Sequence, residues 1–165
     1  MICFSRHLAL TNEVEMLRIF VDADACPVKD EVLRVAERHD LDVYIVSNSG
    51  MRPSRNPKVK QIVVPQTPDA ADDWIVEHIA RDDICITADI PLAARCIEIG
   101  GVALHSNGKP FTTESIGMAL AMRELMQNLR EAGDIKGTNP PFSKEDRSRF
   151  LRSLEEAIQV KIRRR

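Results

Sequence analysis

The 165-residue chain is close to neutral, with a formal net charge of −2 at pH 7, and 44% of its residues are hydrophobic. This length favours a single domain that can bury a core. No apolar run approaches the roughly 20 residues that a membrane-spanning helix requires. An aromatic content of only 4% argues against a stacking platform for single-stranded nucleic acid.

The two ends of the chain differ from its middle. Residues 1–15 have neither the long apolar core nor the small-residue cleavage site of a secretion signal, so we expect a loose extension or a misassigned start. Residues 16–160 form the expected domain, and residues 161–165 form a frayed basic tail.

The four cysteines show no paired spacing such as C-x-x-C. They are Cys3, Cys26, Cys85 and Cys96. We therefore expect buried thiols in a protein of the reducing cytoplasm.

Five short apolar runs predict the strands of one sheet. They span residues 17–21, 42–46, 61–64, 84–87 and 102–104. Continuous apolar runs of this length are typical of parallel strands that are buried on both faces. Because helical segments alternate with most of these runs, the sequence predicts βαβ units. The expected fold is an α/β three-layer sandwich, with a mostly parallel sheet of about five strands and helices on both faces.

Helical periodicity and capping residues predict five helices. They cover about residues 27–39, 69–80, 91–99, 113–132 and 143–158. Pro27 and Pro91 suit the first position of a helix, where a missing N–H costs no hydrogen bond. Asp69 and Ser143 are each followed three residues later by an aspartate, a pattern typical of a helix N-terminus.

The helix expected at residues 113–132 carries an apolar stripe at helical spacing. The stripe consists of Met118, Met122, Leu125, Met126 and Leu129. This pattern predicts a face that packs in the core or against a partner, and not a cofactor site. The sequence leaves the oligomeric state open.

Acidic side chains follow two of the expected strands. Asp22 and Asp24 come directly after the first strand, and Asp89 follows the fourth. Because ligands of open α/β sheets bind at the carboxyl ends of the strands, the three carboxylates converge there if these two strands are neighbours. Asp72 lies on the core-facing side of the second helix, where a carboxylate is costly unless it is paired or bound to a metal, whereas Asp73 turns outward.

Clustered aspartates without His or Cys suit Mg²⁺ or Mn²⁺ and not zinc. Such an ion orients water for in-line attack on a phosphodiester and stabilises charge on the leaving oxygen. The residues leave an alternative open, because each aspartate, Asp69 included, could instead cap the helix that follows it. Their concentration at one sheet edge favours the metal site.

A basic loop follows the second strand. Its charged residues are Arg52, Arg55, Lys58 and Lys60. A loop at that edge can hold phosphate oxygens beside the metal, but the same charges also suit a solvated surface.

Four motifs closely resemble the YaiI/YqxD family of bacterial proteins, and the resemblance covers about residues 16–158. The motifs are VDADACP at residues 21–27, DAAD at 69–72, ITADIPLA at 86–93, and NPPF at 139–142 before Asp146-Arg147. This family is grouped with the PIN-like nuclease folds, whose members use acidic residues at these strand ends to bind Mg²⁺ or Mn²⁺ and cut RNA.

The resemblance implies site residues and RNA as a partner. The implied catalytic and metal-binding residues are Asp22, Asp24, Asp72 and Asp89, and the family's polar loop positions give Asn48, Ser54 and Arg55 as substrate-binding candidates. Further candidates are Asp69, Asp73 and Thr87. Typical PIN nucleases also carry a late acidic residue that has no secure equivalent in this chain.

Two other classes of protein fit some of these residues. An apolar strand followed by Asp-x-Asp resembles the first motif of haloacid-dehalogenase-like phosphatases, and residues 45–48 resemble the second. In that chemistry Asp22 is the nucleophile and Asp24 the general acid/base, although Cys26 stands where Thr or Val is usual. The third reading is a non-catalytic RNA-binding or adaptor protein that keeps the fold and its caps.

Overall fold

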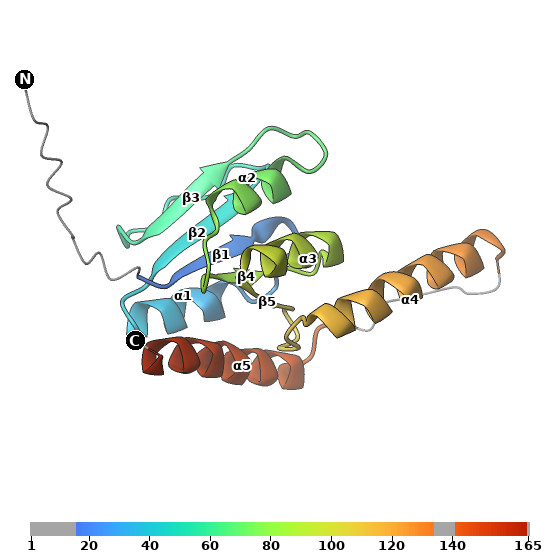
Figure 1. Cartoon of the computed structure of the whole chain (residues 1–165). Coiled ribbons are helices and arrows are strands. Elements are labelled where there is room, and N and C mark those ends of the chain that lie inside the picture. The colour runs from blue at the N-terminus through green and yellow to red at the C-terminus, as the bar shows by residue number, and fades with distance from the viewer. Residues whose placement is uncertain (1–15, 134–140, 165) are drawn as a thin grey trace, which may run out of the picture.

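The computed structural model describes residues 16–133 and 141–164 (Figure 1). Its centre is a five-stranded sheet in the order β3-β2-β1-β4-β5, and all neighbouring strands are parallel. The strands are β1 (Arg18–Asp22), β2 (Asp42–Ser47), β3 (Val59–Val63), β4 (Ile84–Ile86) and β5 (Val102–Leu104). This confirms the predicted α/β class. It also makes β1 and β4 neighbours, as the expected convergence of carboxylates requires.

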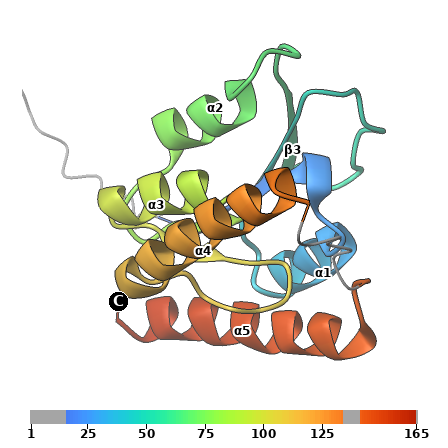
Figure 2. The same ribbon diagram turned by 90° about the vertical axis from the view of Figure 1, so that its right-hand side faces the viewer.

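Helices cover both faces of the sheet and complete the predicted three-layer sandwich. One face packs against α1 (Lys29–Arg38) and α5 (Lys144–Arg163), and the other against α2 (Ala70–His78) and α3 (Ile90–Ile99). The remaining helix, α4 (Thr113–Glu131), extends away from the sheet (Figures 1 and 2).

The central strands are apolar throughout because their alternating side chains enter two separate cores. Ile19 and Val21 pack on the side of α1 and α5, whereas Phe20 packs on the side of α2 and α3. All three are fully buried. Successive side chains of a strand point to opposite faces, so a strand with two covered faces has no position for a solvated residue.

The chain between β1 and α1 differs from the prediction. The sequence predicts a helix that opens at Pro27, but a short 3₁₀ turn, η1 (Ala23–Ala25), follows β1, and α1 begins only at Lys29. The backbone N–H of Cys26 donates to the carbonyl oxygen of Ala23 and closes this turn. Asp24 therefore lies in a tight turn at the end of the sheet, and not at the N-terminus of a long helix.

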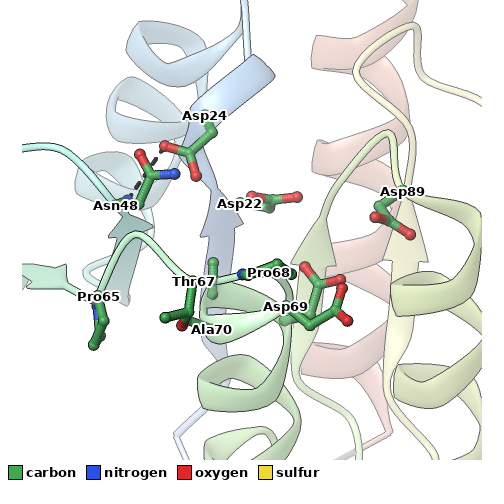
Figure 3. A pocket seen from close by; sticks show the side chains of 11 residues that line it. Asp22, Asp24, Asn48, Pro65, Thr67, Pro68, Asp69, Ala70 and Asp89 are labelled. Carbon is green, nitrogen blue, oxygen red and sulfur yellow. Dashed lines mark hydrogen bonds between the residues drawn. The ribbon is translucent and has the colours of Figure 1, made fainter.

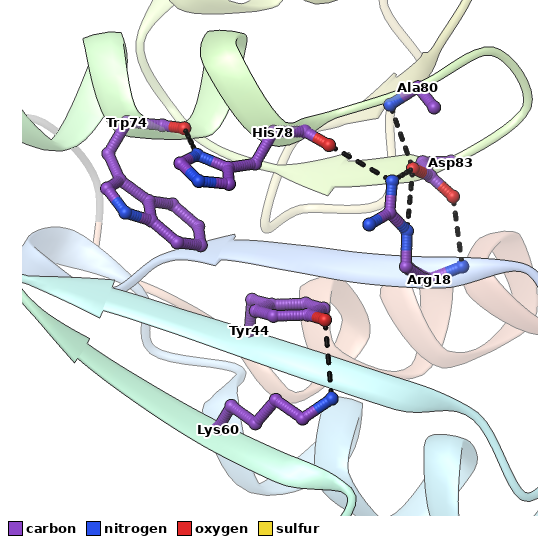
Figure 4. Close-up of polar contacts among 7 residues, drawn as sticks. All are labelled: Arg18, Tyr44, Lys60, Trp74, His78, Ala80 and Asp83. Carbon is purple, nitrogen blue, oxygen red and sulfur yellow. Dashed lines mark hydrogen bonds and ion pairs between the residues drawn. The ribbon is translucent and has the colours of Figure 1, made fainter.

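A buried ion pair joins the beginnings of β1 and β4 (Figure 4). The Asp83 carboxylate, in a residue only 4% exposed, accepts hydrogen bonds from Arg18 Nε at 3.1 Å and Nη2 at 2.7 Å. It also accepts from the backbone N–H groups of Arg18 at 3.1 Å and Ala80 at 2.9 Å. These contacts use both carboxylate oxygens and tie together the two strands whose far ends carry the candidate site.

Most of the apolar stripe of α4 is exposed, so it does not pack in the core, and the other predicted alternative, packing against a partner, stays a prediction. Among the residues that the structure describes, the helix packs against the body of the protein at its beginning, through Ile116, which lies near Ala93 and Ala103. Beyond that contact the helix leaves the sandwich (Figure 1). Helical spacing of apolar residues shows that one face is apolar but does not show what covers it.

The C-terminal residues also differ from the prediction. α5 continues through Lys161 to Arg163, and Lys161 forms an ion pair with Asp82, so residues 161–163 are helical and do not form a frayed tail. The expected extension, residues 1–15, lies outside the described residues.

Two further expectations concern single features. Cys85 and Cys96 are buried as predicted, whereas Cys26 is half-buried; Cys3 lies outside the described residues. Within residues 16–133 and 141–164, no helix is long and apolar enough to cross a membrane.

Candidate functional site

A pocket of about 280 Å³ at the carboxyl end of the sheet is lined mainly by acidic residues (Figure 3). Its aspartates are Asp22, Asp24, Asp69, Asp72 and Asp89. The other lining residues are Asn48 and part of the segment from Pro65 to Ala71, and no described basic residue lines the pocket. The structure thus brings together the four aspartates that the family resemblance implies, and adds Asp69.

A buried hydroxyl connects the carboxylate of Asp22 with the backbone of Asp89. Thr87 is 3% exposed, and its Oγ1 donates to Asp22 Oδ2 at 3.0 Å while accepting from the backbone N–H of Asp89 at 2.9 Å. Burial raises the pKa of Asp22; the Thr87 hydrogen bond opposes this rise, and the charges of Asp24 and Asp89 add to it. Asp22 is therefore fixed in position while its ionised form is disfavoured.

The end of β2 holds the second carboxylate of the Asp-x-Asp segment. Asp24 Oδ1 accepts from Ser47 Oγ at 2.9 Å and from the backbone N–H of Asn48 at 3.3 Å (Figure 3). Ser47 is buried, whereas Asp24 and Asn48 are exposed at the pocket. Ser47 is not among the site residues that the sequence predicts, although a polar residue at the end of a buried apolar strand is a usable signal.

Of the pocket aspartates that occupy N-cap positions, only one caps its helix through a side-chain hydrogen bond. Asp89 Oδ1 accepts from the backbone N–H of Leu92 at 3.1 Å and caps α3. Asp22 and Asp69 also occupy N-cap positions, but neither side chain makes a capping hydrogen bond. The prediction that Asp69 caps α2 through its side chain is wrong, because its backbone adopts the left-handed conformation with φ of 63°.

Among the aspartates of the pocket, Asp72 has a clearly raised pKa. Burial raises its pKa to about 6, with contributions from the charges of Asp89, Asp22 and Asp69. Its neighbour Asp73 is exposed, does not line the pocket, and forms an ion pair with Arg95 at 2.9 Å. Adjacent aspartates on α2 therefore have different environments, as the expected helix faces predict.

Two of the loop candidates lie outside the pocket. Asn48 lines it, but Ser54 and Arg55 do not. Ser54 Oγ instead accepts from the backbone N–H of Asn56 at 3.2 Å within its own loop, and Arg55 is exposed.

The donor set of the pocket suits a hard divalent cation. Carboxylate and amide oxygens are the ligands that Mg²⁺ and Mn²⁺ prefer, and the raised pKa of Asp72 reflects negative charge that a cation would offset. Among the described residues, no three His, Cys, Asp or Glu side chains form a group that could hold one ion. An ion bound here would therefore retain water ligands, as Mg²⁺ usually does.

Comparison with known proteins agrees with the resemblance carried by the motifs. The family model described as an uncharacterised bacterial family, YaiI/YqxD, matches residues 20–160. The chain belongs to this family. No solved structure matches the chain significantly.

Members of this family are similar to the chain over nearly their whole length. The UPF0178 protein of Parvibaculum lavamentivorans is 67% identical over 150 residues, which cover 91% of this chain and 98% of that protein. The UPF0178 protein of Rhodospirillum rubrum is 58% identical over 145 residues, covering 87% and 97%. That of Mesorhizobium japonicum is 55% identical over 141 residues, covering 86% and 91%.

The raised pKa of Asp72 predicts that Asp72→Asn stabilises the protein above pH 6. A carboxyl group whose pKa is higher in the folded than in the unfolded state reduces the free energy of unfolding as the pH rises from about 4 to about 6. The shift sets an upper limit of about 3 kcal/mol. Because much of the side chain is accessible to solvent, we expect about 1 kcal/mol.

Urea unfolding at pH 4 and pH 7.5, with EDTA present, measures this gain. It should appear at pH 7.5 and vanish at pH 4. Asp73→Asn serves as the control, because Asp73 lies outside the pocket and should show no such pH-dependent gain. An equal effect of Asp72→Asn at both pH values would contradict the prediction.

Proposed function

We propose that the protein is a hydrolase of phosphodiester bonds that depends on Mg²⁺ or Mn²⁺ and that its substrate is RNA. The observation that carries this proposal is the pocket at the ends of β1 and β4, where five aspartates gather without a basic residue among the described lining. Aspartates that raise each other's pKa are a costly arrangement for a purely structural site.

Each carboxylate has a role in this proposal. At most two of Asp22, Asp24, Asp72 and Asp89 hold the ion directly, and the others hold its water ligands. Thr87 and Ser47 fix Asp22 and Asp24 by hydrogen bonds. A bound divalent ion supplies an oriented water and stabilises charge on the leaving oxygen. We assign proton transfer from the attacking water to Asp72. Its carboxylate lines the pocket and makes no side-chain hydrogen bond or ion pair among the described residues, whereas the other three carboxylates each accept a hydrogen bond.

The loop after β2 supplies the proposed contacts to the substrate. Asn48 lines the pocket, and Arg52, Ser54 and Arg55 are exposed further along the same loop. Guanidinium groups bind phosphate oxygens through charge-assisted hydrogen bonds, so the loop can hold the phosphates that flank the scissile bond. We further propose that the fold belongs with the PIN-like nucleases and that the protein acts in the cytoplasm.

The pKa and the hydrogen bond of Asp22 favour a phosphodiester substrate over a phosphate monoester. A phosphatase of the haloacid-dehalogenase type needs this carboxylate ionised as the nucleophile. Burial raises its pKa, and Thr87 already donates a hydrogen bond to one of its oxygens. Both roles need the ionised form, but a bound cation favours that form, and the hydrogen bond from Thr87 leaves the other carboxylate oxygen free for the ion.

One assay tests the proposal against both alternatives. The protein is incubated with labelled single-stranded RNA or with a generic phosphate monoester, each with Mn²⁺, Mg²⁺ or EDTA. Cleavage of RNA that requires the metal is the expected result. Turnover of the monoester with a trapped aspartyl phosphate would instead identify a phosphatase. RNA retained on a filter without cleavage in any condition would identify a binding protein.

A further inference from the structure

The apolar face of α4 is large for an uncovered surface of a single helix. Its exposed residues are Met118, Met122, Leu125 and Met126, with exposed fractions between 38% and 76%. The helix has 19 residues and extends about 28 Å, but it contacts α3 only near its beginning (Figure 1). Helices in water depend on packing of their apolar face for most of their stability. Within residues 16–133 and 141–164, nothing provides the contact that would stabilise the exposed face of α4.

The spacing of the apolar residues specifies how this face packs. Met118, Met122, Leu125 and Leu129 are separated by four, three and four residues, which is the a/d spacing of a coiled coil. At about 100° per residue, these four positions lie within an arc of about 60° on the helix. Ile116, which contacts the body of the protein, lies on a different side. The stripe is therefore a second, separate packing face.

Charge along the helix indicates a second copy of the same chain as the partner. When two such helices run antiparallel about a two-fold axis between residues 123 and 124, Met122 of one copy faces Leu125 of the other, and Met118 faces Leu129. The positions beside this seam are uncharged: Ala119, Ala121, Met126 and Asn128. Arg123 and Glu124 point away from it, and Glu114 lies one turn before the stripe. Self-pairing thus brings no like charges together along the seam.

We propose that the protein forms a homodimer through antiparallel pairing of α4 with α4 of a second copy. The absence of basic residues from the stripe makes it unsuitable for nucleic acid, which binds through Lys and Arg. A contact limited to two helices of this length lies at the small end of specific interfaces, so we expect a dissociation constant in roughly the micromolar range. The proposal does not depend on the proposed activity, because the acidic pocket draws no residue from α4.

Sedimentation velocity of the full chain over a concentration series tests this pairing. The wild-type protein should change from monomer to dimer as its concentration rises. Met122→Glu and Leu125→Lys should each raise the dissociation constant at least about tenfold, because each places a charge against an apolar side chain of the partner. Gln127→Glu, on the opposite side of the helix, is the matched control and should leave the dimer unchanged.

Recombining the two charges tests the antiparallel direction. Antiparallel pairing places position 122 of one copy against position 125 of the other. An equimolar mixture of the Met122→Glu and Leu125→Lys proteins should therefore form dimers, and so should the double variant. Parallel pairing would place like charges together in the double variant and keep it monomeric. The proposal is overturned by a wild-type monomer throughout the micromolar range, by a dimer that neither single variant weakens, or by failure of the recombined charges to restore dimerisation.

Discussion

Asp72→Asn should lower the kcat/KM for metal-dependent RNA cleavage at least about 100-fold, as expected when a group that acts at the reacting centre is removed. Asp72 lines the acidic pocket with Asp22, Asp69 and Asp89, and burial together with their charges raises its pKa to about 6. An amide at this position keeps the shape of the side chain but removes both the negative charge and the ability to accept a proton. The loss should persist at saturating Mn²⁺ if proton transfer is the main role of Asp72.

The matched control for this experiment is Asp73→Asn. Asp73 is the next residue of the same helix and carries the same functional group, but it is exposed and ion-paired with Arg95 outside the pocket. Its substitution should change kcat/KM less than about threefold, because surface ion pairs contribute little. The test is to measure kcat/KM in parallel for the wild type and both variants. Equal losses of kcat/KM in the two variants would contradict the catalytic role of Asp72.

The combination of effects at Asp72 is more specific than either effect alone. Asp72→Asn should be more stable than the wild type at pH 7.5 and much less active. Such an opposite change is expected where repulsion between charges is retained for function. A residue that matters only for folding would lose stability and activity together.

Much of the fold could be predicted because the apolar pattern and the sheet rules act locally. The run at residues 17–21 is apolar at every position but one, and this pattern is typical of a strand between two covered faces. The predicted convergence of Asp22 and Asp89 requires β1 and β4 to be neighbouring strands. Whether these two strands are neighbours depends on the order of strands in the sheet, and no local sequence pattern encodes that order.

The features that sequence reasoning missed depend on backbone conformation and on contacts distant in sequence. The expected cap at Asp69 fails because this residue has a left-handed backbone, which composition does not reveal. Ser47 contacts Asp24 because Asp22 pairs with Val46 in the parallel register of β1 and β2, so the next residue of β2 meets the turn after β1. Ser47 and Asp24 are 23 residues apart in the chain.

The stripe of α4 shows a different limit. Its 4-3-4 spacing is equally compatible with burial inside the domain and with burial in an interface between chains, because periodicity describes one helix and not its surroundings. Only the position of the helix relative to the sheet shows that the stripe is not buried inside the domain.

Asp83→Asn should reduce the free energy of unfolding by about 3 kcal/mol, because it breaks a buried ion pair while Arg18 stays charged. The Asp83 carboxylate receives four hydrogen bonds, three from Arg18 and one from the backbone of Ala80 (Figure 4). An asparagine side chain has only one acceptor oxygen, so its NH₂ group would face donors that it cannot satisfy.

The neighbouring substitution Asp82→Asn is the control for this measurement. Asp82 also forms an ion pair, with Lys161, but the Asp82 side chain is half exposed, so its substitution should cost less than about 1 kcal/mol. Asparagine also tolerates the left-handed backbone of this residue, where φ is 71°. Urea unfolding of both variants at pH 7 tests the difference. If Asp83→Asn cost no more than Asp82→Asn, the buried ion pair would not be what holds β1 against β4, and the alignment of Asp22 with Thr87 would have to depend on the strand hydrogen bonds and core packing alone.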